Sequence, residues 1–285
     1  MITIRWKSEK EPKMYCREAK NGVVYLTFPL LENTHLVCHA FSTRIGGVSK
    51  GDLSGMNLSF SRGDDPENVK KNYRVFSEAA GFPVSSLVTS DQTHTTNVRL
   101  VTKKDCGSGI VRPRDFTEVD GLITSDPGVT LVTFYADCVP LYFVDPVHRA
   151  IGLSHSGWRG TVNKMGLVTI RAMEQAFGTR PEDLVTAIGP SICEDCYEVS
   201  EDVIEKFRCA FAESVHDRLF YRKPDGKYQL NLWEANRIIL MDAGVPKRQI
   251  AMPNLCTCCN PDFLFSHRAS GGKRGNLGAF LMLCR

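Results

Sequence analysis

Three short apolar segments follow one another in the middle of the chain and restrict its fold more than any other feature. They are residues 129–135 (VTLVTFY), 139–144 (VPLYFV) and 149–154 (RAIGLS), and the turn at Asp145-Pro146 separates the last two. Segments of this length, rich in β-branched and aromatic residues, predict buried strands rather than helices. The centre of the protein is therefore expected to be a β-sheet.

Further strands and helices are expected on both sides of this centre. Strands are predicted at residues 23–29, 35–43 and 184–190 and in the C-terminal GAFLMLC, and helices at 66–80, 160–177, 200–213 and 231–243. The mixture lacks strict alternation, which predicts an α+β fold with mixed sheets flanked by helices. No repeat or linker divides the chain, so we expect a single catalytic domain over residues 1–285.

Several residues are expected to begin or end these helices. Pro66 stands at the start of the first helix and Gly81 just past its end, as is typical of helix termini. Gly178 is expected to cap the second helix at its C-terminus. Ser200 and Asn231 are the predicted N-caps of the last two helices.

The composition excludes several classes of protein. The hydrophobic fraction is 42%, and the formal net charge of +3 is too small for a dedicated binder of nucleic acid or anionic membranes. The sequence contains no run of about 18 apolar residues, so no transmembrane helix is expected. The opening MITIRWKSEKEPK lacks the apolar region of a secretory signal. We therefore expect a cytoplasmic protein without nucleic-acid or membrane partners, and the sequence does not define its oligomeric state.

One cysteine and two histidines each stand beside a local turn, and Cys138 and His155 also stand at the ends of predicted strands. His94 lies in SDQTHT, Cys138 in YADCVP and His155 in LSHSGWRG. A thiolate and two imidazoles suit Zn²⁺, and three protein ligands leave one position open, as in a catalytic zinc site. The spacing is not that of a zinc finger, so from spacing alone the commoner interpretation is a buried cysteine and two hydrogen-bonded histidines.

Five strings of the sequence carry a family resemblance. The segments RIGGVSKG, QTH, DGLITSDPGVTLVTFYADCVPLYFVDP, HSGWRGTV and IGPSICEDCYEV resemble the YfiH/laccase-domain family, from about Arg44 to Arg268. The resemblance implies a YfiH-like layered sandwich. It also implies a zinc-dependent enzyme whose substrates are purine nucleosides and phosphate, with one catalytic zinc ion held by His94, Cys138 and His155.

Two reactions follow from this resemblance. One is the phosphorolysis of adenosine, inosine, guanosine and methylthioadenosine to the base and ribose 1-phosphate, and the other is the deamination of adenosine. The sequence does not rank these nucleosides. Cys138 would serve both as a metal ligand and as part of the catalytic machinery.

Residues beside the motifs are candidates for binding phosphate. Gly157 and Arg159 lie at the start of the predicted helix after His155, where free N–H groups and a guanidinium suit an anion. The alternative is that Arg159 pairs with a carboxylate. Arg44 precedes Gly46-Gly47, which would let the backbone approach a ligand closely or would form an ordinary hairpin turn.

Two further residues have open roles. Asp137 precedes Cys138 and is expected to orient another group or to act as a general acid or base. Arg268 lies in FLFSHRASGGKRGNLG, which resembles the closing segment of the family, although His267 stands where a basic residue is usual and the loop is extended. Arg268 either lines the pocket or closes the fold.

Eleven cysteines are many for a cytoplasmic protein, where thiols, metal ligands and catalytic groups are expected rather than disulfides. Two clusters stand apart from Cys138, namely Cys193 with Cys196, and Cys256 with Cys258 and Cys259. We expect structural thiols there, because C-x-C-C is an awkward zinc spacing and no thioredoxin-like context surrounds CEDC. A second metal or redox site is the alternative.

Three other functions compete with the zinc nucleoside enzyme. A copper polyphenol oxidase is disfavoured because the chain has seven histidines and no H-x-H pair, so zinc is preferred over copper. A metal-free cysteine hydrolase would use Cys138 as nucleophile and His155 as base. A non-enzymatic binding module has little support, because no charged tail or amphipathic stripe exceeds the needs of a core.

Overall fold

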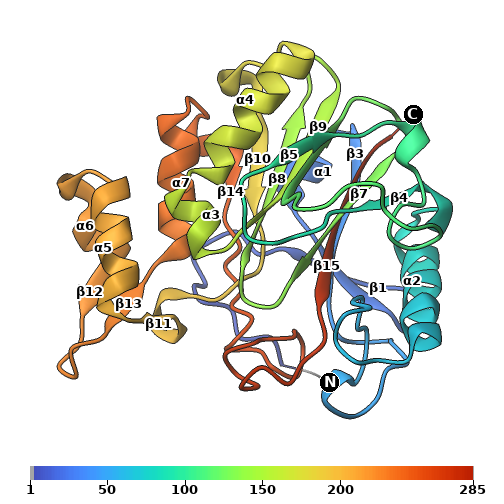
Figure 1. Ribbon diagram of the computed structural model, residues 1–285, viewed down its shortest axis with the longest axis horizontal. Coiled ribbons are helices and arrows are strands. Elements are labelled where there is room, and N and C mark those ends of the chain that lie inside the picture. Colours follow the sequence, from blue (N-terminus) through green and yellow to red (C-terminus); the bar gives the residue numbers. More distant parts are fainter. Residues whose placement is uncertain (1–2, 285) are drawn as a thin grey trace.

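The computed structural model describes residues 3–284 and contains two large sheets and one small sheet (Figure 1). The first comprises β1 (Tyr15–Glu18), β2 (Val24–Thr27), β3 (Val37–Ser42), β4 (Leu87–Thr89), β7 (Thr130–Tyr135) and β15 (Leu277–Leu283), in the order β1-β2-β3-β15-β7-β4. The second comprises β5 (Val98–Leu100), β6 (Gly121–Thr124), β8 (Val139–Asp145), β9 (Ala150–Ser156), β10 (Val185–Ile188) and β14 (Ile250–Ala251), in the order β14-β10-β8-β9-β6-β5. The small sheet has the order β11-β13-β12 and comprises β11 (Glu198–Val199), β12 (Phe220–Arg222) and β13 (Tyr228–Leu230).

Both large sheets are mixed. Strand β4 is parallel to β7 in the first sheet, and β5 and β14 are parallel to their neighbours in the second, whereas the other pairs are antiparallel. The three central segments of the sequence form β7, β8 and β9, as predicted. The predicted α+β fold with mixed sheets is confirmed.

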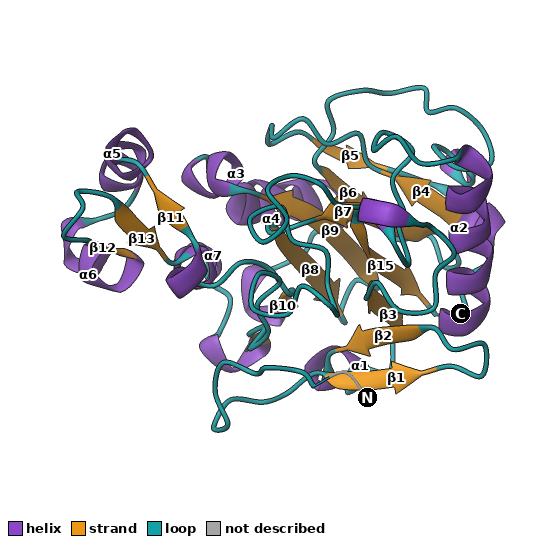
Figure 2. Ribbon diagram, turned by 90° about the horizontal axis from the view of Figure 1, so that it is seen from below, coloured by secondary structure: helices purple, strands orange, loops and turns teal. Residues whose placement is uncertain are grey.

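Helices lie on the outer faces of the two large sheets, which pack against each other (Figures 1 and 2). The helices are α1 (Pro29–Glu32), α2 (Pro66–Ala80), α3 (Trp158–Val162), α4 (Met165–Phe177), α5 (Glu201–Ala210), α6 (His216–Leu219) and α7 (Leu232–Asp242). Apolar residues of both sheets, among them Leu131, Tyr142 and Leu153, share one buried core. The outer face of the first sheet packs against α2, where the rings of Phe76 and Phe280 stack 4.5 Å apart.

A third core joins the second sheet to the helices on its far side. It contains Phe143 of β8, Met173 of α4 and Ile239 of α7, and it extends to the small sheet and α5. The layers therefore run from α2 through the first and second sheets to α4 and α7. None of the helices within residues 3–284 is long and apolar enough to cross a membrane.

The predicted ends of α2 are confirmed. Asp65 is its N-cap and accepts a hydrogen bond from the Glu67 N–H, Pro66 is the first helical residue, and Gly81 adopts a left-handed conformation with φ of 79°. These residues satisfy backbone groups that a helix end leaves unpaired. Gly178 and Asn231 also cap α4 and α7 as predicted.

The single helix predicted over residues 160–177 is wrong, because two helices occupy this region. Helix α3 ends at Val162 and α4 begins at Met165, and Lys164 between them has a φ of 59°. A left-handed residue cannot continue an α-helix, so the chain changes direction there. Ser200 precedes α5, but its hydroxyl donates to Asp202 instead of capping the helix.

His39 in β3 makes stability depend on pH. It is buried, and its Nε2 accepts a hydrogen bond from the Phe28 N–H at 2.7 Å. Burial lowers the pKa of His39 from 6.5 to about 4. As the pH falls from 6.5 towards 4, the unfolded chain takes up a proton that the folded protein excludes, so the free energy of unfolding decreases by about 3 kcal/mol.

The variant His39→Gln isolates this contribution, because its amide oxygen can accept the same hydrogen bond and does not titrate. Urea unfolding at pH 7 and pH 4.5 should show a smaller acid-induced loss of stability in the variant than in the unaltered protein. Equal losses in the two proteins would contradict the assignment.

Candidate metal centre

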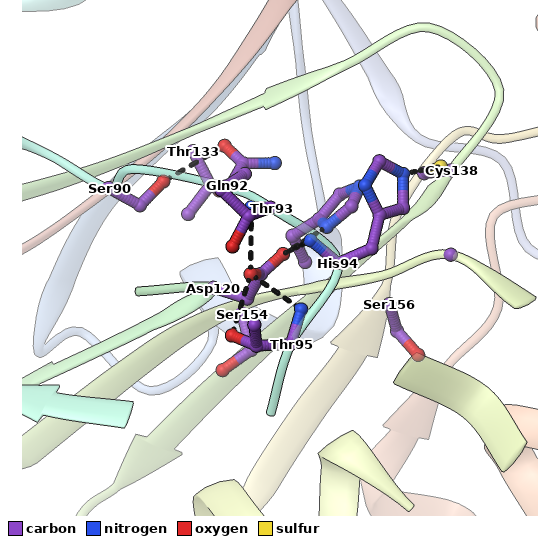
Figure 3. A network of polar contacts seen from close by, with 12 residues as sticks. Ser90, Gln92, Thr93, His94, Thr95, Asp120, Thr133, Cys138, Ser154 and Ser156 are labelled. Atoms are coloured by element: carbon purple, nitrogen blue, oxygen red, sulfur yellow. Dashed lines mark hydrogen bonds and ion pairs between the residues drawn. The ribbon is translucent and has the colours of Figure 1, made fainter. Parts of the chain in front are cut away.

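His94, Cys138 and His155 come from three separate segments and meet at one place. Figure 3 shows the ring of His94 directed at Cys138. His94 lies on the loop between β4 and β5, Cys138 on the turn between β7 and β8, and His155 in β9. The antiparallel pairing of β8 with β9 sets Pro140 opposite His155, which brings the turn that carries Cys138 beside that histidine. The three ligand atoms lie within 4.8 Å of one another.

The separations and chemistry of these donors fit a zinc ion. Cys138 Sγ is 4.0 Å from His94 Nε2, and the two imidazole rings are nearly perpendicular at 82°. In a tetrahedral site with ordinary Zn–S and Zn–N bonds, a sulfur and a nitrogen ligand lie about 3.6 Å apart. A small inward movement of the side chains would therefore complete a site with two imidazoles, one thiolate and one open position.

A single buried carboxylate positions both histidines. The Asp120 side chain accepts hydrogen bonds from three successive backbone N–H groups, those of Thr93, His94 and Thr95, at 2.9 to 3.2 Å. It also accepts from His155 Nδ1 at 2.7 Å, which directs Nε2 of that ring towards Cys138. Figure 3 shows Asp120 between the loop that carries His94 and the end of β9. Asp120 was not predicted as a site residue.

The protonation of these groups is coupled through short contacts. Burial raises the pKa of Asp120, but its bonds with His155 and the backbone outweigh this and lower it. Burial also raises the pKa of Cys138, yet the two histidines lower it to about 6. Burial lowers the pKa of His155, whereas Cys138 and Asp120 raise it to about 9. Cys138 is therefore available as a thiolate, the form that binds metals.

The backbone around the centre is held in uncommon conformations. His94 has a φ of 65° and Asp137 a φ of 91°, which are unfavourable for residues with a Cβ atom. Gly157 follows β9 and lies so close that a Cβ atom there would be 3.0 Å from Cys138 Sγ and 3.2 Å from His94 Cδ2. The strands and loops thus pack tightly around the three ligand side chains.

Replacing Asp120 with asparagine should weaken metal binding about 10- to 100-fold, because partners of metal-bound histidines contribute about this much affinity. Competition with a chelator measures the change. Asp145→Asn is a matched control, because Asp145 is equally buried and pairs with His148 Nδ1 at 2.9 Å away from the centre. Unchanged affinity in Asp120→Asn, or an equal loss in both variants, would contradict the role of Asp120.

The metal centre opens into a cavity of about 750 Å³. A volume of this size can hold a ligand as large as a nucleoside with phosphate. His94, Cys138 and His155 form part of its wall, together with aromatic residues and arginines, which are Phe60, Tyr73, Phe116, Phe134, Tyr135, Arg62, Arg112, Arg114 and Arg274. The cavity therefore combines apolar faces with positive charge beside the metal centre.

Arg274 is the cavity residue best suited to an anion. Its side chain is 9% exposed, and its guanidinium donates to Gly275 O and to the Asn276 side chain, with no carboxylate partner among residues 3–284. Its buried Nε has no hydrogen-bond partner. Burial and the nearby Arg62 lower the pKa of Arg274 to about 10, which leaves it charged at neutral pH. A buried cation without a counter-ion is stabilised by a bound anion.

Asp137 has a different environment from that of the metal ligands. Strand β7 ends at Tyr135, so Asp137 lies in the turn and not in a strand. Its carboxylate accepts from Thr257 Oγ1 at 2.6 Å and from the Arg268 N–H at 2.7 Å, and Asp137 is not among the residues that form the cavity wall. These contacts suit the orienting role, because both carboxylate oxygens are engaged by protein groups.

The basic residues predicted to bind phosphate are not among those that line this cavity. Arg44 donates to the carbonyls of Ser54 and Pro261, and the guanidinium of Arg159 lies 4.3 Å from the Trp158 ring. Arg268 donates to the carbonyls of Cys196 and Glu198. Their roles, and that of Gly157, in binding phosphate remain predictions, whereas Arg62 and Arg274 in the cavity wall were not predicted.

The glycines beside Arg44 approach protein backbone rather than a ligand. A Cβ atom on Gly47 would lie 2.2 Å from the backbone of Gly55 and Met56, and one on Gly46 would lie 2.5 Å from Val23. Gly46 also has a φ of 85°. The loop is therefore a tight turn packed on neighbouring chain segments, which was the alternative to a ligand loop.

Known proteins share both the sequence and the fold of this chain. Residues 38–284 match the family described as multi-copper polyphenol oxidoreductase laccase. The chain is 35% identical over 251 residues to Purine nucleoside phosphorylase YlmD of Bacillus subtilis (strain 168), covering 88% of this chain and 90% of that protein. The structure matches that of YlmD from Geobacillus stearothermophilus with a TM-score of 0.87 and 34% identity, over 96% of this chain and 100% of that one. It also matches the Bacillus licheniformis hypothetical protein YfiH with a TM-score of 0.86 and 31% identity, over 94% of this chain and 98% of that one.

Proposed function

This chain belongs to the family described as multi-copper polyphenol oxidoreductase laccase, and we propose that it catalyses the phosphorolysis of purine nucleosides with one zinc ion. The observation that carries the proposal is that a single cavity contains the His94–Cys138–His155 donor set and the carboxylate-free Arg274. The names of relatives such as Purine nucleoside phosphorylase YlmD support the phosphorylase assignment. The proposed substrates are adenosine, inosine, guanosine and methylthioadenosine, and the proposed second activity is the deamination of adenosine.

The arginines of the cavity provide the site for phosphate. Arg274 and the exposed Arg62 carry like charges, and Arg62 lowers the pKa of Arg274, so an anion between the two guanidinium groups would be stabilised by both. A phosphate dianion accepts several charge-assisted hydrogen bonds from guanidinium groups. Phosphate held there would lie in the same cavity as the metal centre, which is where a nucleoside C1′ must be presented for attack.

The aromatic residues of the cavity provide faces for the purine. Phe60 is 39% exposed and stacks on Tyr73 with ring centroids 6.0 Å apart, while Phe134 is partly exposed on β7. Purine rings stack on such faces with little dependence on the exocyclic group at C6. This tolerance is consistent with a substrate range that includes both 6-amino and 6-oxo purines.

The metal would be held by His94 Nε2, Cys138 Sγ and His155 Nε2. A zinc ion bound there supplies an open coordination position for a phosphate, water or ribose oxygen. Asp120 keeps His155 in the tautomer that presents Nε2, and it fixes the loop that carries His94. Asp137 holds the Cys138 turn against Thr257 and the backbone of Arg268.

The donor set supports zinc more strongly than the copper chemistry suggested by the family description. A trinuclear copper centre needs many histidines, but His94 and His155 are the two histidines that join a cluster of possible metal ligands within residues 3–284. An electron-transfer copper site with the same two histidines and cysteine commonly adds a distant axial methionine, and no methionine lines the described cavity.

Incubation of the purified protein with adenosine, with and without phosphate, tests the proposal. We expect adenine and ribose 1-phosphate from adenosine only when phosphate is present. Deamination should give inosine in either condition, and with phosphate part of that inosine is cleaved further to hypoxanthine. Anaerobic and aerobic rates should be equal, because neither reaction consumes O₂. Unchanged adenosine in the presence of phosphate and zinc would refute the proposed function.

A metal-free cysteine hydrolase is the second candidate, and one observation favours it. The Asp120–His155–Cys138 arrangement has the order of a carboxylate, an imidazole and a thiol, with 2.7 Å between Asp120 Oδ1 and His155 Nδ1. The position of His94 beside the same sulfur instead favours a metal. A chelator that removes the metal should abolish activity in the zinc enzyme and leave a cysteine hydrolase active.

A further inference from the structure

Two C-x-x-C pairs from distant parts of the chain meet outside the cavity. Cys193 and Cys196 flank a short turn that precedes the small sheet, and Cys256 and Cys259 lie on the loop after β14. An isolated β-bridge between Ser191 and Cys256 joins these two segments, and the Thr257 N–H donates to the Ser191 carbonyl at 3.1 Å. All four sulfur atoms lie within 4.8 Å of one another. The sequence predicted structural thiols here, with a second metal or redox site as the alternative.

The distances between the sulfurs suit a shared metal ion. Cys196 Sγ and Cys193 Sγ lie 3.5 and 3.9 Å from Cys259 Sγ, and all four residues are free cysteines. In a tetrahedral zinc site with Zn–S bonds of about 2.3 Å, neighbouring sulfurs are about 3.8 Å apart. The cluster therefore already has the dimensions of a tetrathiolate site.

Backbone N–H groups point at one of these sulfurs. Cys256 Sγ accepts from the Cys193 N–H at 3.2 Å and from the Cys259 N–H at 3.4 Å. A neutral thiol is a weak acceptor, whereas a metal-bound thiolate is commonly stabilised by such donors. The ammonium of Lys7 lies nearby, where it pairs with Asp195 between Cys193 and Cys196 at 2.5 Å. The two backbone donors thus favour a negatively charged sulfur at Cys256.

We propose that Cys193, Cys196, Cys256 and Cys259 bind a structural zinc ion that is separate from the metal at Cys138. Four thiolate ligands complete a tetrahedral site and leave no position for substrate, so this ion has a structural role. Cys258 lies in the same loop without joining the set. The spacing C-x-C-C therefore contains an ordinary C-x-x-C pair, Cys256 with Cys259, into which an additional cysteine is inserted.

The proposed ion would fix two segments that support the metal centre. Thr257, next to Cys256, donates to Asp137 Oδ1, and the Cys196 carbonyl accepts from Arg268 Nη1 at 3.2 Å. The Arg268 N–H also donates to Asp137, which precedes Cys138. Loss of the ion is therefore expected to loosen the turn that carries Cys138 without removing any ligand of the cavity metal.

Metal analysis of variants tests this proposal independently of any nucleoside activity. Protein purified from zinc-supplemented cells should contain about two zinc ions per chain, one for each donor set. Cys259→Ser should lose one ion and keep the other, and His155→Ala should do the same at the cavity site. Cys209→Ser is a matched control, because Cys209 is an exposed free cysteine on α5 and should leave the zinc content unchanged.

Cobalt substitution distinguishes the two sites without relying on the folding of a variant. A Co²⁺ ion bound by four thiolates gives much stronger sulfur-to-metal charge-transfer absorbance than one bound by a single thiolate. We expect this intense absorbance in the unaltered protein and in His155→Ala, and its loss in Cys259→Ser. Its absence from the unaltered protein overturns the proposal, whether or not Cys259→Ser folds.

Three other results would overturn the assignment. They are iron in place of zinc at the thiolate cluster, a disulfide between its cysteines in peptide maps of protein purified under reducing conditions, and a zinc content unaffected by Cys259→Ser. Failure of the nucleoside assay leaves this test intact, because the readouts are metal content and absorbance.

Discussion

Replacing His155 with alanine is expected to lower kcat/KM for adenosine phosphorolysis by about a thousandfold or more and to remove one metal ion per chain. His155 is 4% exposed, and its ring connects Asp120 with Cys138. Its loss leaves two of the three cavity ligands and deprives the Asp120 carboxylate of a buried partner. Steady-state kinetics and metal analysis of the same preparation measure both effects.

The control for this prediction is His148→Ala. His148 is also paired with a buried aspartate, Asp145, but it lies outside the cavity wall. Its removal should leave kcat/KM and metal content unchanged. A His155→Ala protein that lacks the cavity metal and remains active would refute the proposed zinc mechanism.

Replacing Arg274 with alanine is expected to reduce kcat/KM for phosphate by about a hundredfold, because charge-assisted hydrogen bonds to a phosphate contribute about 1.5–3 kcal/mol each. Adenosine deamination needs no phosphate, so its rate should change far less. The ratio of adenine to the sum of inosine and hypoxanthine formed from adenosine measures the difference. This ratio separates loss of the anion site from a general loss of structure.

Lys273→Ala is the matched control for Arg274→Ala. Lys273 precedes Arg274 in the same loop and is exposed, so its removal should change phosphate dependence less than about twofold. An equal loss of phosphorolysis and deamination in Arg274→Ala would show that this arginine does not act on phosphate. An unchanged KM for phosphate in Arg274→Ala would also show that this arginine does not bind phosphate.

Local sequence signals predicted most of the layered fold. The β-branched segments became β7, β8 and β9, and Pro66 and Gly81 mark the ends of α2. These signals operate over a few residues, so neighbouring side chains largely determine the outcome. The division between α3 and α4 was missed because the apolar spacing continues across Lys164. Lysine is not a residue type that predicts the left-handed conformation found there.

The candidate site was predictable only in part. His94, Cys138 and His155 have ligand chemistry and stand beside local turns, and the family motifs selected them from seven histidines and eleven cysteines. Asp120 contacts residues 93–95 and His155, and such long-range hydrogen bonds leave no periodic pattern in the sequence from which they could be predicted. The one available signal was a carboxylate directly before the buried strand 121–124, where an unpaired charge would be costly.

Arg274 was missed, and the two cysteine clusters were predicted as structural thiols with a second metal or redox site only as the alternative. Arg274 lies in a loop with glycine and lysine neighbours, which is typical of an exposed segment, yet the fold buries it beside the cavity. Cys258 obscured the C-x-x-C spacing of Cys256 and Cys259. Burial and proximity across more than sixty residues depend on tertiary packing, which the sequence of a single loop does not specify.

The sharing of Asp120 by two histidines has a consequence for dynamics. A ligand that draws His94 deeper into the cavity must stretch the bonds from residues 93–95 to the same carboxylate that orients His155. Occupancy of the cavity and rigidity of that loop are therefore thermodynamically linked. Hydrogen exchange of these amides would then report on whether substrate is bound, although none of them needs to touch it.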